Sequence, residues 1–426
     1  MSDKLALDGG PGTVPEGTIK SWPPHDQRDR DAVTAVFDSD VFHGSSAPRC
    51  VELQEKWAEY CGAKYCLVTN SGTSALHMAV ASAGVLPGDE VITSAFSFWA
   101  SAAAILHQCA IPVFVDIDPK TYTIDPALIE EKITERTSAV LPVSIHGMPF
   151  DHDPVFEVAR KHDLKVVHDD CQAHGATYKG KRMGSFDHTT GFSLNRSKNL
   201  TAGEGGLYTT NDEAMKAHAH KMREFGEVVL PDRDREYNAF GLGWMYRPHE
   251  FINAFCLAQL ERLDENNAGR IEFSEFLTAG LAEIPGFAGP YDPDWAQPVY
   301  YVYVVEFRPD ELGLDCTPLE MKQACVKAMA AEGIGLGQWQ TRPIPGQDVF
   351  QDKVGFGRGV PWSLNPEVEY EYRSEDYPRT VEFIDGHSYL RGVYPPNDLE
   401  LMKLYLAGFR KVSDNIERVL ELAAEE

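Results

Sequence analysis

The sequence predicts an α/β protein in which a mostly parallel β-sheet lies between layers of helices. Between residues 65 and 225, apolar runs of four to seven residues alternate with segments of helical character. Short apolar runs of this kind are typical of parallel strands that are buried on both faces. Polar and glycine-rich turns follow several of the runs, as expected where ligands bind at the carboxyl ends of strands.

The elements before residue 164 are predicted from turn residues and apolar spacing. Residues 1 to about 20 are polar and rich in glycine and proline, and we expect them to form a loose arm. A helix is predicted at Pro48–Tyr60, because proline suits the first helical position. A strand at Tyr65–Thr69, a turn and a helix at Ser74–Ala83 come next. Further strands are predicted at 90–93, 111–118 and 138–147, and further helices at 126–135 and 153–162.

The segment from Leu164 to Thr210 carries the candidate chemistry. One apolar run is followed by Asp169, and a second contains Ser193 near its end, with Lys198 just beyond it. Because strand ends share one edge of a parallel sheet, we expect the acid, the hydroxyl and the amine to lie together. A lysine with a carboxylate about thirty residues upstream suits Schiff-base chemistry on pyridoxal phosphate (PLP). The amine bonds to the aldehyde, and the carboxylate keeps the ring nitrogen protonated.

The chain after residue 210 predicts a second, smaller domain. A helix is expected at 212–225 and a long helix, with a possible bend, from about 250 toward 281. Pro285-Gly286 marks the boundary between domains. A strand at 299–307, a helix at 318–332, a Pro- and Gly-rich loop at 338–366 and a helical stretch at 398–422 complete an α+β unit. The predicted organisation is an N-terminal arm at 1–30, a large cofactor-binding domain at 31–285 and a small domain at 286–426.

Composition and motif context exclude several classes of protein. The formal net charge is −26, which disfavours a nucleic-acid partner, because such proteins need clustered Lys and Arg. No apolar run is long enough to span a membrane, and the N-terminus lacks the apolar core of a signal peptide. The eight cysteines form no CxxC pair, so no metal site is predicted and a reducing cytoplasm is expected. A nicotinamide dehydrogenase is disfavoured, because GIGLGQ at 333–338 follows a helix and ends in glutamine.

Residues 169–176, DDCQAHGA, and 193–206, SLNRSKNLTAGEGG, resemble the DegT/DnrJ/StrS family of PLP-dependent sugar aminotransferases. The resemblance extends from about Ser45 to the C-terminus and implies the fold-type I (aspartate aminotransferase-like) architecture. It implies transfer of an amino group from L-glutamate or L-glutamine to a keto sugar or keto-cyclitol, in amino-sugar biosynthesis. It also implies a homodimer with its sites at the interface, acting on a small-molecule amino donor and a small-molecule acceptor.

The same resemblance assigns roles around the candidate lysine. Lys198 would hold PLP as a Schiff base and, once freed, would move a proton between the donor α-carbon and the cofactor. Adjacent strand residues face opposite sides, so Asp169 and Asp170 cannot both reach the cofactor, and the D-x-x-Q-A-H-G spacing of the family selects Asp169. Gln172 would lie near the 3′-oxygen of the ring. Ser193 would add a hydroxyl to the phosphate site.

The turn Asn70-Ser71-Gly72-Thr73 between a strand and a helix is a candidate anion site. Free backbone N–H groups and the positive end of the helix would face one point, although an ordinary capped helix has the same sequence pattern. The resemblance implies that Thr73 and Ser74 contact the cofactor phosphate. It also implies that an aromatic side chain stacks on the PLP ring. By spacing this falls on Phe98, with Trp99 as the alternative, whereas composition alone favours core packing for both.

Three residues depart from the family pattern, and several activities remain open. His168 stands where an acid is usual, Asp170 where alanine is usual, and Met245 where an asparagine often reaches the phosphate of the neighbouring subunit. The alternatives are another PLP reaction, namely elimination or dehydration, decarboxylation or epimerisation, and a non-catalytic PLP-fold regulator. Relatives that act as dehydratases replace the lysine by histidine, so Lys198 argues against that activity.

Overall fold

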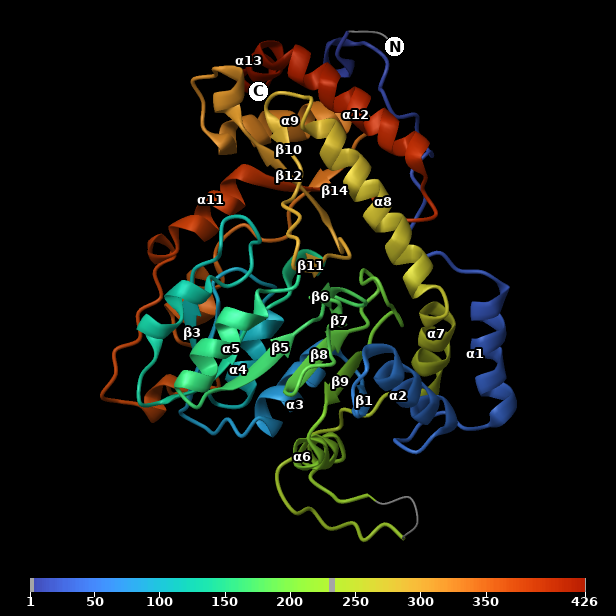
Figure 1. The fold of residues 1–426 in the computed structure, drawn as a ribbon, viewed down its shortest axis with the longest axis vertical. Coiled ribbons are helices and arrows are strands. Elements are labelled where there is room, and N and C mark those ends of the chain that lie inside the picture. Colours follow the sequence, from blue (N-terminus) through green and yellow to red (C-terminus); the bar gives the residue numbers. More distant parts are fainter. Residues whose placement is uncertain (1–3, 230–233, 426) are drawn as a thin grey trace.

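The computed structural model describes residues 4–229 and 234–425, and its centre is a seven-stranded sheet (Figure 1). The strand order is β1-β9-β8-β5-β4-β2-β3, in which β9 is antiparallel to both neighbours and the other adjacent pairs are parallel. The predicted mostly parallel sheet is therefore confirmed. The strands are β1 (Tyr65–Thr69), β2 (Glu90–Ser94), β3 (Ile111–Val115), β4 (Thr137–Leu141), β5 (Lys165–Asp169), β8 (Thr189–Ser193) and β9 (Gly206–Thr210).

Helices cover this sheet on both faces, because alternate strand residues are apolar toward each side. Val91, Leu141 and Val167 pack into one core with the helices of the first face, and Ile92 and Val140 pack into another with α5. The surrounding helices are α2 (Pro48–Cys61), α3 (Gly72–Ser82), α4 (Ala100–His107), α5 (His152–Lys161), α6 (Glu213–Arg223) and α7 (Glu250–Leu260). The nearly complete burial of α3 explains its continuous apolar and small-residue sequence.

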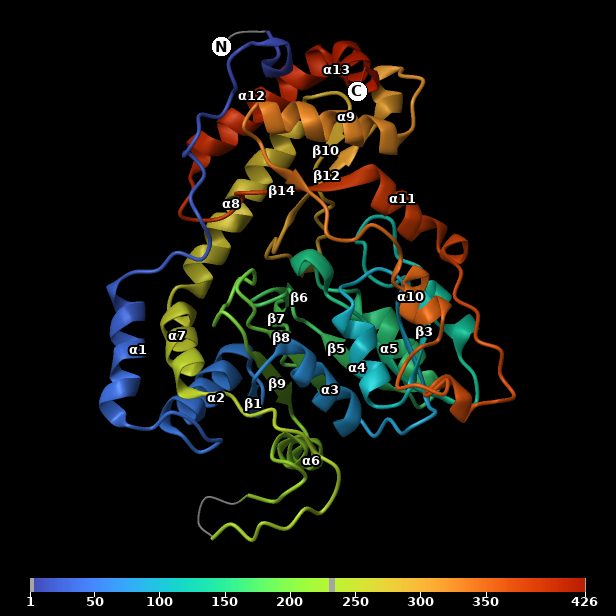
Figure 2. The ribbon, with the colours of Figure 1, turned by 180° about the vertical axis from the view of Figure 1, so that it is seen from behind.

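A second sheet, order β10-β12-β14-β13, forms the other body of the molecule (Figures 1 and 2). It packs with α8 (Leu263–Leu281), α9 (Pro318–Ala331), α12 (Leu399–Asp414) and α13 (Ile416–Ala424) into one apolar core. The predicted long helix divides into α7 and α8, which leads into this body. The remaining elements are β10 (Phe287–Ala288), β12 (Tyr303–Phe307), β13 (Leu336–Gly337), α11 (Pro378–Gly386) and β14 (His387–Leu390). A third, small sheet consists of β11 (Ala296–Gln297), β6 (Thr177–Tyr178) and β7 (Lys181–Arg182), and its strands pair with neither of the other two sheets.

The N-terminal segment is packed, and not loose as the sequence suggested. From residue 4 it runs along the second body and then descends past α8 to α1 (Gln27–Ser39) (Figure 2). The Glu332 carboxylate accepts hydrogen bonds from the Ala6 amide and from the amide and hydroxyl of Thr13. Leu5 and Val14 are buried in the same core as α9 and α12. Residues 4–26 are called the N-terminal strap below.

Four predicted elements are shorter than their sequence patterns suggested. The helix expected at 126–135 is two 3₁₀ turns, at Pro126–Leu128 and Glu130–Lys132, and the second ends because the backbone of Ile133 is extended (φ −75°, ψ 131°). The strand at 111–118 ends at Val115. A turn follows, in which Asp118 Oδ1 accepts hydrogen bonds from the amides of Lys120 and Thr121. The strand at 138–147 ends at Leu141 before a turn in which His146 has a left-handed φ of 58°. The strand at 299–307 begins only at Tyr303.

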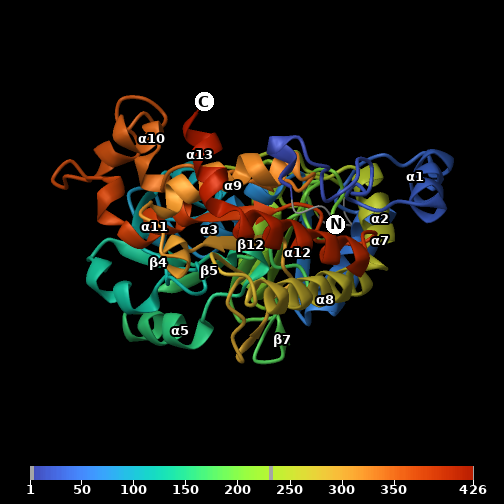
Figure 3. The same cartoon turned by 90° about the horizontal axis from the view of Figure 1, so that it is seen from above.

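One part of the chain after residue 285 returns to the first sheet. The segment 344–377, which contains α10 (Asp348–Gln351), buries Ile344, Phe350 and Tyr372 against Phe114 of β3. Seen from above, α10 and α1 lie at opposite ends of the molecule (Figure 3). We retain the domain division at residue 285 as a proposal, with this returning segment as a part of the larger unit. Within the described residues, no helix combines the length and the apolar character needed to cross a membrane.

Candidate active site

A cavity of about 480 Å³ opens at the carboxyl ends of β5 and β8. Asp169 is the last residue of β5 and Ser193 the last residue of β8, and the two strands are paired in parallel. Six of the seven residues that the sequence suggested for the site line this cavity: Thr73, Phe98, Asp169, Gln172, Ser193 and Lys198. The seventh, Ser74, does not line it. Sheet topology therefore brings together side chains that are up to 125 positions apart in the sequence, counted from residue 73 to residue 198.

The turn after β1 forms one wall of the cavity. Ser71 caps α3, since its Oγ accepts the Ser74 amide at 3.1 Å. The Ser74 hydroxyl donates to Asn70 Oδ1 at 2.6 Å and is turned away from the cavity. The first amides of a helix have no partner within the helix, and those of Gly72 and Thr73 have no hydrogen-bond acceptor among the described residues.

Close packing of this turn against β8 depends on a glycine. A Cβ atom added to Gly72 would lie 2.6 Å from Cβ and 2.9 Å from Cα of Ser193. The first turn of α3 can therefore approach the end of β8 only with glycine at position 72. The result is a small polar cradle made of backbone amides and the hydroxyls of Thr73 and Ser193.

Asp169 is a buried carboxylate that faces the cavity. Its Oδ2 accepts from Ser101 Oγ at 2.6 Å, its Oδ1 accepts from the Cys171 amide at 3.1 Å, and only 4% of the residue is exposed. Ser101 is in turn 2.6 Å from the hydroxyl of Ser97. Throughout the part of the chain that the structure describes, no Lys, Arg or His side chain pairs with Asp169. Buried carboxylates normally have a cationic partner, so this arrangement suits a positively charged ligand atom.

Asp170 points to the opposite side of the sheet, as strand geometry requires. It lies fully buried beside His168, with 3.9 Å between its Oδ2 and His168 Nδ1, and accepts from Ser144 Oγ at 2.7 Å. Burial raises the pKa of Asp170 to about 8 and lowers that of His168 well below its ordinary value. Both groups are therefore neutral near pH 7, and neither lines the cavity.

Lys198 enters the cavity from the loop after β8. Its Nζ lies 4.1 Å from the centre of the Tyr301 ring. The Tyr301 hydroxyl is 2.8 Å from Ser197 Oγ, and Ser197 donates in turn to Asn195 Oδ1. Asn195 also donates to Glu204 at 2.8 Å, which ties the lysine loop to the Gly-Glu-Gly-Gly turn that follows it. A network of neutral and acidic groups thus fixes the loop around the lysine.

Gln172 and the aromatic residues complete the walls. The amide of His146 donates to Gln172 Oε1 at 2.8 Å, which leaves the NH₂ group of Gln172 for the cavity. His146 is itself buried outside the cavity, and burial lowers its pKa to about 3. Phe98 is 55% exposed and lies 6.2 Å from Trp339, which also lines the cavity. Trp99, the alternative stacking residue, packs instead against Phe350 in an apolar core.

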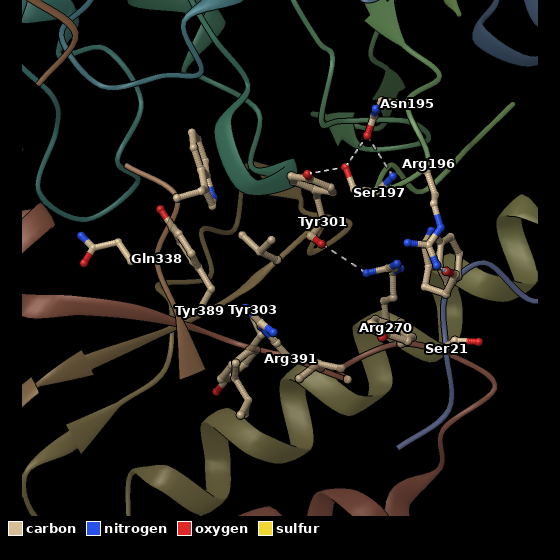
Figure 4. A pocket seen from close by; sticks show the side chains of 18 residues that line it. Ser21, Asn195, Arg196, Ser197, Arg270, Tyr301, Tyr303, Gln338, Tyr389 and Arg391 are labelled. Carbon is tan, nitrogen blue, oxygen red and sulfur yellow. Dashed lines mark hydrogen bonds between the residues drawn. The ribbon is translucent and has the colours of Figure 1, made fainter. Parts of the chain in front are cut away.

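A second cavity of about 700 Å³ adjoins the first and is shown in Figure 4. The two share Asn195, Ser197, Tyr301 and Trp339. The described lining of the second cavity includes three arginines and no acidic residue, in a chain with a net charge of −26. The arginines come from three places: Arg196 from the lysine loop, Arg270 from α8 and Arg391 from the end of β14.

Sequence reasoning missed the residues that reach the site from elsewhere in the chain. Ser101 has no motif around it, and only the fold shows that α4 brings it to Asp169. Tyr301 comes from beyond residue 285, where the sequence predicts a separate domain. Trp22 belongs to the strap and had no assigned role. Glycine and apolar patterns carry no signal for such long-range contacts.

Comparison with known proteins gives a consistent result. Residues 23–361 match the model of the DegT/DnrJ/EryC1/StrS aminotransferase family. The chain is 36% identical over 320 residues to a GDP-perosamine synthase of Caulobacter vibrioides, covering 75% of this chain and 82% of that protein. It is 35% identical over 356 residues to an L-glutamine:scyllo-inosose aminotransferase of Streptomyces griseus, covering 81% of this chain and 82% of that protein.

Solved structures share the fold. S. venezuelae DesV, solved in complex with a ketimine intermediate, superposes with a TM-score of 0.79 at 27% identity, covering 91% of this chain and 95% of that chain. 3-Amino-5-hydroxybenzoic acid synthase superposes with a TM-score of 0.81 at 26% identity, covering 94% of this chain and 99% of that chain.

Proposed function

Because the chain belongs to the DegT/DnrJ/EryC1/StrS aminotransferase family, we propose that it is a PLP-dependent aminotransferase acting on a keto sugar or keto-cyclitol. The amino group comes from L-glutamate or L-glutamine. The single observation that carries the proposal is the cavity in which Lys198 and Asp169 meet the polar cradle of Thr73 and Ser193.

The residues of the cavity fit PLP in charge and shape. The cradle suits a phosphate, because free helix amides and hydroxyls bind anions. No cationic side chain of the described residues pairs with Asp169, which can therefore pair with a protonated ring nitrogen. Gln172 keeps its NH₂ group for an oxygen of the ring, and Phe98 offers an aromatic face. When bound, PLP supplies an electron sink for bonds at the donor α-carbon.

The side chains of the chain then have separate roles. Lys198 attaches the cofactor and, once displaced by the donor amine, moves a proton as general base and acid. Asp169 would pair with the ring nitrogen and keep it protonated, and Ser101 keeps the carboxylate oriented through its 2.6 Å hydrogen bond. Tyr301 covers the amine of Lys198 from the side of the second cavity, 4.1 Å away.

The second cavity is suited to the substrates. Hydroxyl and amide groups of Asn195, Ser197 and Tyr389 line it, as a polyhydroxylated ring requires. Its arginines, without acidic neighbours in the lining, favour an anionic group, which the carboxylates of a glutamate or glutamine donor supply. The relatives differ in acceptor: one is named for a GDP-linked sugar and the other for scyllo-inosose. A ring ketone is the feature that both classes share.

A homodimer is the proposed assembly. Large apolar side chains are exposed along the described parts of 225–245, and Leu242 is 89% exposed. The full set is Phe225, Val228, Tyr237, Phe240, Leu242, Trp244 and Met245. Such a patch on one segment favours burial against a second copy. The segment also contacts the turn that precedes α3, since the Met245 carbonyl accepts from Asn70 Nδ2 at 3.1 Å.

The test is a pair of half-reactions. The PLP-loaded protein is mixed with L-glutamate or L-glutamine, and conversion of the cofactor to pyridoxamine phosphate is followed by absorbance. The pyridoxamine form is then offered keto sugars, free and nucleotide-linked, and inososes. Conversion by a donor and return by one acceptor class are expected. An absorbance spectrum unchanged by both donors and by other amino acids would remove the proposed reaction.

A further inference from the structure

The N-terminal strap makes a direct contact with the backbone of Lys198, and we propose that Trp22 is a positioning residue for this lysine. The proposal rests on the proposed role of Lys198 in holding PLP. The indole N–H of Trp22 donates to the carbonyl oxygen of Lys198 at 3.1 Å. The strap is thereby part of the active site, although its sequence offers no catalytic motif.

Among the described residues, Trp22 is the one donor outside the lysine loop that forms a hydrogen bond with the backbone of Lys198. The Lys198 amide donates to the Asn195 carbonyl at 2.9 Å, within the same loop. A second bond joins strap and loop, because Arg196 Nη2 donates to the Trp22 carbonyl at 3.0 Å. The lysine backbone is therefore held between a local turn and the strap.

The ring of Trp22 also braces the residue that covers the lysine amine. Arg270 lies over the indole, with its guanidinium carbon 4.4 Å from the ring centre. Arg270 Nη1 donates to the carbonyls of Tyr300 and Tyr301, at 3.2 and 3.3 Å, and Figure 4 shows its guanidinium directed toward Tyr301. Trp22 thus contacts the backbone of Lys198 directly. Through Arg270 it also supports Tyr301, the residue that lies beside the Lys198 amine.

Other contacts hold the strap in place without the indole N–H. The Lys20 amide donates to Asn397 Oδ1 at 2.8 Å, and Gln259 Nε2 donates to the Pro24 carbonyl at 3.1 Å. These bonds flank Trp22 on both sides. Loss of the single bond to Lys198 should therefore leave the strap docked and change the placement of the lysine.

The test compares two forms of the cofactor, because only one of them bonds covalently to the lysine. PLP binding includes a Schiff base with Lys198, whereas pyridoxamine phosphate binds without one. Trp22→Phe keeps an aromatic ring on Arg270 and removes the N–H donor. We expect the dissociation constant of PLP to rise about three- to tenfold, the effect of one net hydrogen bond. That of pyridoxamine phosphate should stay within about twofold.

Trp362→Phe is the matched control. Trp362 is a buried tryptophan whose Nε1 donates to the Tyr372 hydroxyl at 2.9 Å, and neither residue lines either cavity. This variant should change neither dissociation constant. Trp22→Tyr, a second ring without the indole N–H, replaces Trp22→Phe if that variant fails to bind pyridoxamine phosphate.

The outcomes separate the positioning role from a structural one. Equal weakening of both cofactor forms would assign Trp22 to general support of the fold, and unchanged affinities would remove its role. Either result overturns the proposal. Failure of the aminotransferase proposal looks different, because the wild-type protein would then give no pyridoxamine phosphate with L-glutamate or L-glutamine, whatever Trp22→Phe does to cofactor affinity. If the wild-type protein forms the Schiff base and Trp22→Phe leaves the ratio of the dissociation constants of PLP and pyridoxamine phosphate unaltered, the positioning role alone is overturned.

Discussion

Replacing Ser101 by alanine tests how far the protein itself tunes Asp169. Ser101 Oγ donates one of the two hydrogen bonds that the Asp169 carboxylate receives, at 2.6 Å, and the Cys171 amide donates the other. A hydrogen bond to a charged acceptor contributes about 1.5–3 kcal/mol. Since 1.36 kcal/mol corresponds to a tenfold change in rate, its loss should slow the half-reaction roughly 10- to 150-fold. The reason is that a less stabilised, less firmly oriented carboxylate keeps the ring nitrogen protonated less well.

Ser144→Ala supplies a matched control on the other face of the same strand. Ser144 Oγ donates to Asp170 at 2.7 Å, so this variant also removes a serine-to-aspartate hydrogen bond. Single-turnover absorbance measurements with L-glutamine should show the large loss for Ser101→Ala only, with Ser144→Ala within about twofold of wild type. PLP should still attach to Lys198 in both variants. Equal half-reaction rates in the two variants would refute the role given to Ser101.

Three further variants test charge, packing and the strap. Burial raises the pKa of Asp170 from 3.8 to about 8, so the free energy of unfolding of the wild type falls as pH rises through this range. In urea unfolding between pH 4 and 8, Asp170→Asn should remove up to about 5 kcal/mol of that fall, and an identical dependence of stability on pH in the two proteins would contradict this. Gly72→Ala places a Cβ atom 2.6 Å from Ser193 Cβ and should distort the cradle. PLP affinity measured by dialysis should drop at least tenfold, by about 1.4 kcal/mol or more, and an unchanged affinity would refute the phosphate-binding role of the cradle. Glu332→Ala frees three strap donors and the Lys411 ammonium, so the free energy of unfolding should fall by about 2–4 kcal/mol; a loss below about 0.5 kcal/mol would count against the anchor.

Local patterns sufficed for the sheet and for the centre of the site. The five residues of β1 were predicted in full, because an apolar run between turn signals is a local property. Asp169 and Lys198 follow strands, and topology alone then brings them to one edge. Ser74 does not line the cavity, and its contact with the cofactor phosphate stays a prediction, because a serine at the third helical position can bond either a ligand or its own turn. Its hydroxyl bonds to Asn70, which sequence does not reveal.

Other features depend on contacts between distant segments. The strap was expected to be loose, since its composition resembles that of a disordered end, yet Glu332 anchors it from more than 300 positions away. Tyr301 reaches Lys198 from the far side of the predicted domain boundary. The expected helix at 126–135 is replaced by two 3₁₀ turns, the second of which ends at the extended Ile133, and the Ile133 side chain packs against the core that contains α5. Secondary-structure propensity reflects residues that are close in the sequence, whereas these features depend on contacts between residues that are far apart in it.

Chemical trapping of the cofactor tests the central assignment most directly. The PLP-loaded protein is reduced with borohydride, digested and examined by mass spectrometry for a phosphopyridoxyl group. We expect a modification on Lys198 and on no other lysine, and its absence in Lys198→Ala, which should also lose turnover. A modification at another lysine, or amino transfer that persists in Lys198→Ala, would contradict it.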